Sequence, residues 1–408
     1  MERDCLLQLI VQAPCRRPGR NDDRLRKSLA VIRPWPGCIG QNLCFPPVNS
    51  QAYHTPVKAA VLYGKEDVRV EEIEPRALQP GEVRIRIKAV LTCGTDLKVF
   101  KRGYHAKMIV PPAVFGHELA GVISEVSSVR CQVSGEDGEN PWKTGDRVVP
   151  ANSAPCGECF HCRAGQENIC DDLLFLNGAY AESIVVPARI VQKNLLRLRP
   201  ETDFRDAALV EPLACVVQGV EDTKMRPGQH VLVLGAGPIG LMFVALAKHL
   251  GCDVTVAGRR AARLETARRL GAGRVIDVGD GYNLVSKTRE TSEEHFDVVV
   301  EAVGVPEVWE AGVHLVRKGG TVNFFCGCPA GTTVSLDTTL IHYSDLTLLA
   351  SFHHTPRTIR RALEFIEAGV IRAADFVDGE CPLDGLPQLF RTMAAGNRVV
   401  KTLIRVRE

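Results

Sequence analysis

The chain has 408 residues, of which 45% are hydrophobic and 24% charged. This length and composition are typical of a globular protein with two domains and a buried core. The formal net charge of +2 is too small to indicate nucleic acid or an anionic membrane as a partner. No apolar run reaches the roughly 18 residues that span a bilayer, and the acidic N-terminus is atypical of a secretory signal. We therefore expect a cytoplasmic protein.

Residues 1–56 differ from the rest of the chain. They hold six prolines before residue 50, many arginines and no sustained periodicity, so we expect a poorly ordered extension. Folded sequence begins at Val57, where an apolar stretch starts. One hypothesis is that the natural protein starts at Val57 and that the preceding residues are mis-assigned upstream sequence. A peptide from residues 1–50 in the natural protein would refute it.

From about residue 57 to residue 150 the sequence predicts mostly β-structure. Residues 82–90 alternate polar and apolar side chains, which predicts a half-buried strand, and residues 121–126 predict another. A polar run at 134–141 predicts a loop. From residue 213 the pattern changes to short strands separated by helices, which predicts a parallel sheet covered by helices.

Residues 230–240 carry a dinucleotide-binding fingerprint. A strand at 230–234 runs into a G-x-G-x-x-G turn, followed by an apolar helix at 241–250 and a strand at 253–257. In this setting the glycines allow the tight turn, the approach of the pyrophosphate and the packing of helix on strand, and the helix N-terminus faces the phosphates. The alternative is a glycine-rich turn in another α/β sheet. The predicted cofactor contacts are Gly235, Gly237, Pro238, Ile239 and Gly240.

The end of the second strand bears on the choice of nucleotide. NAD sites usually place an acid about 20 residues past the fingerprint, whereas this chain has Gly258, Arg259 and Arg260. Guanidinium groups bind a 2′-phosphate through planar, bidentate contacts. The sequence therefore favours NADP and leaves NAD open, because two exposed arginines at a helix start fit the same pattern.

Two later strands end in residues that belong to the same predicted edge of the sheet. The strand at 296–301 runs into Val303 and Gly304, and the strand at 321–325 runs into Cys326 and Gly327. Doubly wound sheets bind their ligand at the carboxyl ends of the strands. These residues are therefore candidates for the nicotinamide neighbourhood, although structural turns explain the glycines equally well.

Four cysteines are closely spaced in one segment. Cys156, Cys159, Cys162 and Cys170 form a C-x2-C-x2-C-x7-C pattern. Four thiolates in one loop suit tetrahedral zinc, and a site with every position filled by protein is structural. An iron–sulfur cluster usually has a shorter last spacing followed by proline, and the surroundings are not basic enough for a zinc ribbon that binds nucleic acid.

A second, looser set consists of Cys93, His117, Glu118 and Glu211. A catalytic zinc needs about three protein ligands and one open position, which Cys93, His117 and one or both glutamates would supply. Taken singly, the histidine next to a glutamate fits a structural role and Cys93 fits a core thiol. The combination with the other motifs favours a catalytic metal site.

Together these motifs resemble the zinc-containing medium-chain dehydrogenase/reductase (alcohol dehydrogenase) family, most closely its sorbitol and threonine dehydrogenase branch. The resemblance covers about residues 57–408. It implies an α/β fold with a GroES-like, β-rich catalytic domain at 57–212, a Rossmann doubly wound parallel sheet at 213–345 and a return to the catalytic domain at 346–408. It also implies a homodimer or homotetramer with one catalytic and one structural zinc ion.

The resemblance implies roles for individual residues. Cys93 and His117 would bind the catalytic zinc. Glu118 would fill a third place, and Glu211 would fill it in other states or through water. Thr95 matches the hydroxyl residue that starts the proton relay, and the four-cysteine segment matches the structural zinc lobe.

The implied activity is hydride transfer between a secondary alcohol, polyol or sugar and NAD(P), with zinc as Lewis acid. The alternatives are threonine 3-dehydrogenase-like oxidation of an amino alcohol, a zinc-free reductase of activated double bonds, and a nucleotide-binding redox sensor without turnover. The chain departs from the family pattern at residues 1–56, at 134–142 and at Gly258, where the family's usual acid favours NAD.

The small-molecule substrate itself is not determined by these motifs. Tyr104, His105, Phe115 and residues 352–354 are candidates for the wall of the substrate pocket, and each is equally consistent with packing.

Overall fold

The computed structural model describes residues 55–105, 107–127, 141–279, 284–291, 295–396 and 399–407. These residues belong to one compact unit that runs from Tyr53 to Glu408. The expectations for the N-terminal extension and for the polar loop at 134–141 fall almost entirely outside the described residues.

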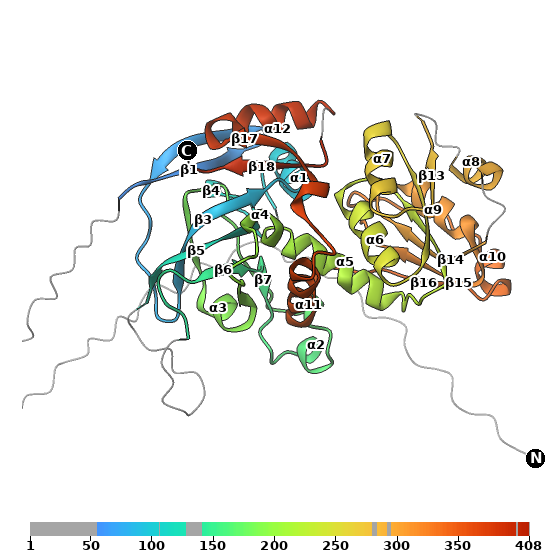
Figure 1. Cartoon of the computed structure of the whole chain (residues 1–408), viewed down its shortest axis with the longest axis horizontal. Helices are drawn as coiled ribbons and strands as arrows, with labels where there is room; N and C mark the ends of the chain where they lie inside the picture. Colours follow the sequence, from blue (N-terminus) through green and yellow to red (C-terminus); the bar gives the residue numbers. More distant parts are fainter. Residues whose placement is uncertain are drawn as a thin grey trace, which may run out of the picture. The chain divides into compact units, whose positions relative to one another are not determined.

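A six-stranded parallel sheet occupies the second half of the chain (Figure 1). Its spatial order is β13-β12-β11-β14-β15-β16, with every neighbouring pair parallel. This is the order of a doubly wound sheet, so the predicted Rossmann fold is confirmed. The strands are β11 (His230–Leu234), β12 (Asp253–Gly258), β13 (Arg274–Asp277), β14 (Phe296–Glu301), β15 (Val316–Phe324) and β16 (Thr347–Leu349).

Helices connect these strands and cover the sheet, which explains why strands such as β11 are nearly continuous runs of buried valine and leucine. The first helix begins directly after the glycine-rich turn, with Gly237 as N-cap and Pro238 in the first turn. The helices are α6 (Pro238–His249), α7 (Ala261–Arg269), α8 (Leu284–Thr291), α9 (Pro306–Leu315) and α10 (Thr338–Tyr343).

The other half of the unit is rich in antiparallel β-structure. A seven-stranded sheet has the order β10-β6-β5-β3-β18-β17, with β9 also paired to β3. Two smaller sheets are β2-β1-β4 and β7-β8. The strands are β1 (Val57–Gly64), β2 (Asp67–Ile73), β3 (Val83–Leu91), β4 (Ala113–Val114), β5 (Glu118–Val126), β6 (Arg147–Pro150), β7 (Ser153–Ala154), β8 (Leu174–Phe175), β9 (Ser183–Val186), β10 (Leu195–Arg197), β17 (Val377–Pro382) and β18 (Lys401–Arg405).

Early and late segments of the chain meet in this large sheet. The C-terminal strand β18 pairs antiparallel with β3 and parallel with β17, and Figure 1 shows it in red beside the blue early strands. The helices of this half are α1 (Gly94–Arg102), α2 (Phe160–Arg163), α3 (Ala188–Asn194), α4 (Phe204–Ala207), α5 (Val210–Asp222), α11 (Pro356–Glu367) and α12 (Leu386–Ala394), with short 3-10 turns at Glu167–Ile169, Ala373–Asp375 and Leu383–Gly385.

The aromatic core of this half joins early and late segments. Phe390 on α12 packs against Phe100 on α1 and against Phe115, with ring centroids 5.4 Å apart in both pairs. Phe115 also makes an edge contact with Tyr180 at 5.0 Å. The interlocked rings stabilise the base on which α1 and β5 present the candidate metal ligands.

The strands predicted at 82–90, 121–126, 230–234, 253–257 and 296–301 correspond to β3, β5, β11, β12 and β14. One boundary differs. The strand expected at 321–325 is β15, which begins at Val316 and therefore includes Gly319 and Gly320. Gly319 adopts a positive φ of 70° within this strand. Among the described residues, no helix combines the length and apolar character needed to cross a membrane.

Candidate active site and metal centres

One cleft is lined by residues from both halves of the unit. It is lined by Thr92, Cys93 and Gly94 from the β-rich half, and by residues 235–238 and 257–260 from the parallel sheet. The predicted metal-ligand cysteine and the predicted nucleotide fingerprint therefore face the same space. This juxtaposition is the geometry that hydride transfer between a bound alcohol and a nicotinamide ring requires.

The fingerprint glycines have distinct steric roles. Gly235 has a φ of 114°, and a Cβ there would lie 2.9 Å from Val303 Cγ2. A Cβ at Gly240 would lie 1.8 Å from the carbonyl oxygen of Gly235, so helix α6 approaches the turn as closely as glycine allows. A Cβ at Gly237 would have no neighbouring atom within 4 Å. The open space in front of Gly237 fits a pyrophosphate at the N-terminus of α6.

Gly258 packs closely against the fingerprint turn. A Cβ at this position would lie 2.7 Å from Ala236 Cβ, so a larger side chain cannot replace the glycine without displacing the fingerprint turn. Arg259 and Arg260 follow it on the wall of the cleft. Arg260 has a φ of 74° and donates from Nη2 to the carbonyl oxygen of Gly396 at 2.8 Å.

The two later strand ends lie against each other. A Cβ at Gly304 would lie 2.8 Å from the carbonyl oxygen of Gly327 and 3.3 Å from Cys326 Cβ. Val303 lines the cleft and is 47% exposed. Glu301, at the end of β14, accepts hydrogen bonds from the N–H groups of Val303 and Gly304, both at 2.8 Å. Burial raises the pKa of Glu301 to about 7.

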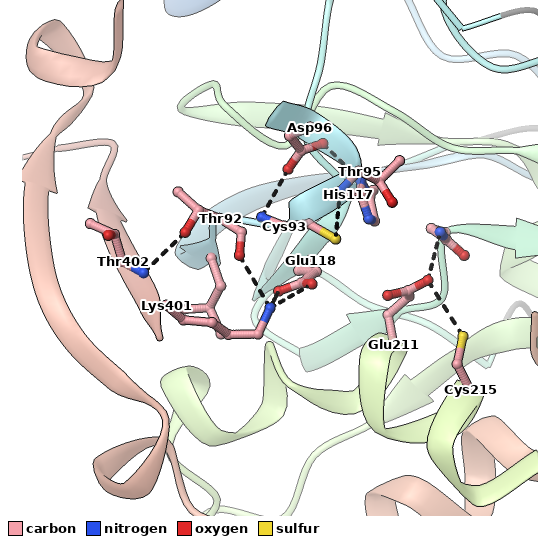
Figure 2. Close-up of polar contacts among 12 residues, drawn as sticks. Thr92, Cys93, Thr95, Asp96, His117, Glu118, Glu211, Cys215, Lys401 and Thr402 are labelled. Atoms are coloured by element: carbon pink, nitrogen blue, oxygen red, sulfur yellow. Dashed lines mark hydrogen bonds and ion pairs between the residues drawn. The ribbon is translucent and has the colours of Figure 1, made fainter. Parts of the chain in front are cut away.

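Cys93, His117 and Glu118 form a candidate catalytic metal centre (Figure 2). Their ligand atoms all lie within 4.8 Å of one another. Cys93 is the N-cap of α1, and its sulfur accepts the N–H of Thr95 at 3.4 Å. His117 and Glu118 lie at the start of β5 and are 3% and 0% exposed. Thiolate, imidazole and carboxylate are the donors that zinc takes in proteins.

Asp96 contacts two of these candidate ligands, His117 and Cys93. Its Oδ1 lies 3.1 Å from His117 Nδ1, and its Oδ2 accepts the N–H of Cys93 at 3.2 Å and the hydroxyl of Tyr180 at 2.6 Å. A carboxylate on the distal nitrogen of a metal-binding histidine fixes its tautomer and orientation. Asp96 lies three positions after Cys93 in the sequence, and the sequence analysis assigned it no role.

Lys401 binds one of the predicted ligands. Its Nζ donates to both carboxylate oxygens of Glu118, at 2.7 Å to Oε1, and to the carbonyl oxygen of Thr92 at 3.1 Å. The lysine side chain is only 3% exposed and the glutamate is fully buried. Both oxygens of Glu118 are thus engaged by a cation in this structure, a relationship that the sequence did not reveal.

Glu211 lies in a second set of potential ligands with Cys215 and His353, whose ligand atoms are also within 4.8 Å of one another. Its Oε1 accepts the side-chain N–H of Asn152 at 2.9 Å and lies 4.0 Å from Cys215 Sγ. Burial raises the pKa of Glu211 to about 7. Figure 2 shows its carboxylate on the opposite side of Cys93 and His117 from Lys401. Cys215 was not among the residues singled out by the sequence analysis.

The four-cysteine segment forms the compact lobe that its spacing predicted. Sulfur–sulfur distances are 3.5 Å for Cys156–Cys170, 3.8 Å for Cys159–Cys170 and 3.9 Å for Cys156–Cys162. Tetrahedral zinc with Zn–S bonds of about 2.3 Å requires sulfur atoms about 3.8 Å apart. The N–H groups of Glu158 and Cys159 lower the pKa of Cys156 to about 6, which favours the thiolate that binds metal.

The candidates for the substrate pocket separate into buried and exposed residues. Phe115 is fully buried in the aromatic core and His354 is 2% exposed, so both pack inside the protein. Tyr104 and Phe352 are 56% and 60% exposed. His353 Nε2 lies 2.6 Å from Ser153 Oγ, and its ring belongs to the ligand set around Glu211. Of these residues, His353 is therefore the one placed beside the metal centre.

Comparison with known proteins agrees with this architecture. Residues 79–195 match the family described as the alcohol dehydrogenase GroES-like domain, and residues 238–368 match the zinc-binding dehydrogenase family. The chain is 34% identical over 328 residues to D-altritol 5-dehydrogenase of Agrobacterium fabrum, covering 78% of this chain and 90% of that protein. It is 28% identical over 352 residues to sorbitol dehydrogenase of Bacillus subtilis, covering 85% and 97%.

A solved structure shows the same fold. The zinc-binding dehydrogenase of Sinorhizobium meliloti 1021, bound to NADP, superimposes with a TM-score of 0.76 at 28% identity and covers 86% of this chain and 99% of that chain. A GroES-like domain with a thiolate–imidazole–carboxylate centre facing a Rossmann fingerprint defines a nucleotide-dependent dehydrogenase. The chain belongs to the zinc-containing medium-chain dehydrogenase/reductase family, in its sorbitol dehydrogenase-like branch. The predicted family, fold and class of enzyme, an NAD(P)-dependent oxidoreductase, are confirmed.

Proposed function

We propose that this enzyme oxidises a secondary hydroxyl group of a polyol, and reduces the corresponding ketone, with NADP as the favoured cofactor. The observation that carries the proposal is the single cleft shared by Cys93 and the fingerprint turn at 235–238. The relatives named as polyol dehydrogenases support the substrate class. In the oxidation, the carbon-bound hydride passes to the nicotinamide ring and the hydroxyl proton leaves to solvent, so that alcohol and NADP⁺ give ketone, NADPH and a proton.

We assign the catalytic metal to Cys93, His117 and Glu211. Glu118 has both oxygens bound by Lys401, whereas Glu211 forms no ion pair with a lysine or arginine of the described residues and accepts from Asn152 at Oε1. When bound there, zinc supplies a Lewis acid that lowers the pKa of the substrate hydroxyl. Lys401 thus favours Glu211 over Glu118 as the third ligand.

The remaining steps belong to side chains of the protein. Asp96 holds the imidazole of His117 in one orientation. The hydroxyl of Thr95, which Figure 2 shows beside His117, accepts the proton that the substrate loses and passes it toward solvent. Val303, on the wall of the cleft, would contact the nicotinamide ring of a bound cofactor. The four-cysteine lobe holds the second, structural zinc.

The preference for NADP rests on the end of β12. Position 258 is a glycine, so the acid that would bind the ribose hydroxyls of NAD is absent there. A Cβ at this position would also lie 2.7 Å from Ala236 Cβ. Arg259 and Arg260 line the cleft at the next two positions, where a 2′-phosphate would lie. The NADP-bound relative of 28% identity supports this choice.

Three further features complete the proposal. The catalytic domain comprises residues 57–212 and 346–408, and the nucleotide domain comprises 213–345. The enzyme is a cytoplasmic homodimer or homotetramer. Analytical ultracentrifugation of the purified protein determines the oligomeric state, and a monomer at micromolar concentration would contradict the last point.

The test combines metal content with initial rates on a panel of sugar alcohols, sugars and amino alcohols, each with NAD and NADP. We expect two zinc ions per chain and turnover of polyols. Cys93→Ala and His117→Ala should each lose the catalytic zinc and the activity, whereas Cys252→Ala, a buried cysteine outside both clusters, should keep both. Turnover that survives these changes would indicate a zinc-free reductase. Nucleotide binding without turnover of any panel member would indicate a sensor.

A further inference from the structure

A buried chain of side chains leads from Glu211 into the protein. Asn152, between β6 and β7, donates from Nδ2 to Glu211 Oε1 at 2.9 Å. Its Oδ1 lies 2.7 Å from Nε2 of His354, in the loop before α11. The three residues are 8%, 3% and 2% exposed for Glu211, Asn152 and His354. They are brought together by the fold alone, since Asn152 and His354 are 202 positions apart.

The chemistry of the groups fixes the direction of both hydrogen bonds. A carboxylate only accepts, so the amide nitrogen of Asn152 faces Glu211 and the amide oxygen faces His354. That oxygen also only accepts, so Nε2 of His354 carries the proton and donates. Burial, with a smaller contribution from His353, lowers the pKa of His354 well below its usual range, so the ring stays neutral.

Nothing else in the described residues uses the polar atoms of His354. Its Nδ1 is buried without a hydrogen-bond partner there. A buried polar atom left unsatisfied destabilises the folded protein, an effect that an apolar residue of similar size would avoid. The histidine therefore costs stability at this position, and the bond to Asn152 is its one polar contact that offsets this cost.

We propose that Asn152 and His354 are positioning residues that hold the carboxylate of Glu211 in the orientation required to bind the catalytic metal. The proposal rests on the function proposed above, in which Glu211 is a metal ligand. A glutamate side chain loses rotamer freedom when it is fixed, which is an entropic cost of metal binding. A bond from Asn152 to Oε1 meets part of that cost before the metal arrives and leaves Oε2 as the donor atom.

This arrangement differs from that of the other glutamate. Glu118 is held by a cation, Lys401, which competes with a metal ion for the same oxygens. Glu211 is held by a neutral amide, which leaves the negative charge of its carboxylate for the metal. Partners of metal ligands typically change metal affinity by about 10–100-fold when they are removed, and we expect the same range here.

The experiment measures metal affinity in the full-length holoenzyme by competition with a chromogenic zinc chelator, which resolves the two zinc ions by their rates of release. Asn152→Leu keeps the branched shape and the number of heavy atoms but removes both hydrogen bonds. We expect its catalytic zinc to bind 10- to 100-fold more weakly, with release from the four-cysteine lobe unchanged. His354→Phe should act in the same direction, and His354→Gln, which retains a donor, should restore part of the affinity.

Asn194→Leu is the matched control. Asn194 is also a fully buried asparagine, but its Nδ2 donates to the carbonyl oxygen of Ser153 at 2.7 Å rather than to Glu211. Equal losses of zinc in Asn194→Leu and Asn152→Leu would show a general packing effect and overturn the proposal, as would wild-type affinity in both Asn152→Leu and His354→Phe. If Asn152→Leu does not fold, His354→Phe and His354→Gln give the same comparison.

The kinetic constants separate this proposal from the one on which it rests. We expect Asn152→Leu to lower kcat while the KM for NADP stays within about twofold, because Glu211, Asn152 and His354 do not line the cleft that contains the fingerprint turn. A wild-type enzyme with only the four-cysteine zinc would refute the proposed catalytic centre itself. A wild-type enzyme with both zinc ions, together with an Asn152→Leu variant of unchanged zinc affinity, would refute only the positioning role of Asn152 and His354.

Discussion

The ammonium group of Lys401 lies 2.7 Å from Oε1 of Glu118, and both side chains are buried. Lys401 begins the last strand of the chain, β18, and Glu118 begins β5, so the pair joins residues 283 positions apart. The contact fixes the C-terminal strand against the metal centre. It also occupies the carboxylate that the sequence had offered as the third zinc ligand.

We expect Lys401→Met to destabilise the protein by about 3–5 kcal/mol, because it leaves the carboxylate of Glu118 buried without its cation. The double variant with Glu118→Gln should lose less than the sum of the two single changes. Urea unfolding of the zinc-loaded proteins measures both effects. Lys58→Met is the control, since Lys58 pairs with Asp384 at an exposed site, where such pairs contribute about 0–1 kcal/mol. A Lys401→Met variant no less stable than Lys58→Met would contradict the expectation.

The four-cysteine lobe should lose its metal without loss of the catalytic zinc. Cys162→Ser removes one of four thiolates from a set in which every position is filled, so we expect the zinc content to fall from two ions per chain to one. The segment around α2 and the turn Glu167–Ile169 should become sensitive to protease, because the metal is the main crosslink of this short segment. Cys252→Ser, in the parallel-sheet half, is the control. Two zinc ions in Cys162→Ser would disprove the assignment.

Nucleotide preference should depend on the arginines at the end of β12. We expect Arg259→Ala to lower kcat/KM for NADP by roughly 10- to 100-fold, in line with about 1.5–3 kcal/mol for hydrogen bonds to charged groups, and to change kcat/KM for NAD little. Arg268→Ala, on the helix α7 that follows Arg259 and Arg260 and paired with Glu265 on an exposed face, should leave the ratio unchanged. A wild-type enzyme that prefers NAD, or an unchanged ratio in Arg259→Ala, would refute the NADP assignment.

Glu301 should make stability depend on pH. Burial raises its folded-state pKa from 4.5 to about 7, so between these values the folded protein binds more protons than the unfolded chain. The free energy of unfolding therefore falls as pH rises through this window, by up to about 3 kcal/mol at roughly 1.36 kcal/mol per pKa unit.

Glu301→Gln removes this ionisation and keeps the oxygen that accepts from Val303 and Gly304. We expect its stability relative to wild type to increase between pH 5 and 8, measured by urea unfolding at several pH values. Glu307→Gln, an exposed acid on α9, is the control and should follow wild type. A Glu301→Gln curve parallel to that of wild type would show that Glu301 does not titrate in this range.

The features that could be predicted from the sequence, the fingerprint turn and the four-cysteine segment, each depend on residues that are close together in the chain. The fingerprint turn needs only residues 235–240 in their strand–turn–helix setting, and the four cysteines lie within fifteen positions of one another. In both cases the local chain geometry brings the functional atoms together, so spacing alone carries the signal. The structure places β11, the turn and α6 where this pattern requires.

The contacts that were not predicted join distant segments. Lys401 reads as one polar residue at the start of a C-terminal strand, and Asn152 as one amide in a loop. Their partners are fixed only when β18 enters the large sheet and when the loop before α11 packs beside β7. Asp96 is an intermediate case, because it lies three positions from Cys93 but its contact with His117 requires α1 and β5 to meet.

The proposed function requires that hydride passes from an alcohol carbon to NAD(P) at the metal centre that contains Cys93. Isotope transfer tests it most directly: the enzyme is incubated with NADP⁺ and a polyol deuterated at its secondary carbinol carbons, and the reduced cofactor is examined by mass spectrometry and NMR. We expect one deuterium at C4 of the nicotinamide ring with wild-type enzyme and none with Cys93→Ala. Reduced cofactor that lacks deuterium would contradict direct hydride transfer from the alcohol carbon. Labelling that Cys93→Ala retains at the wild-type rate would contradict the role of the metal centre that contains Cys93.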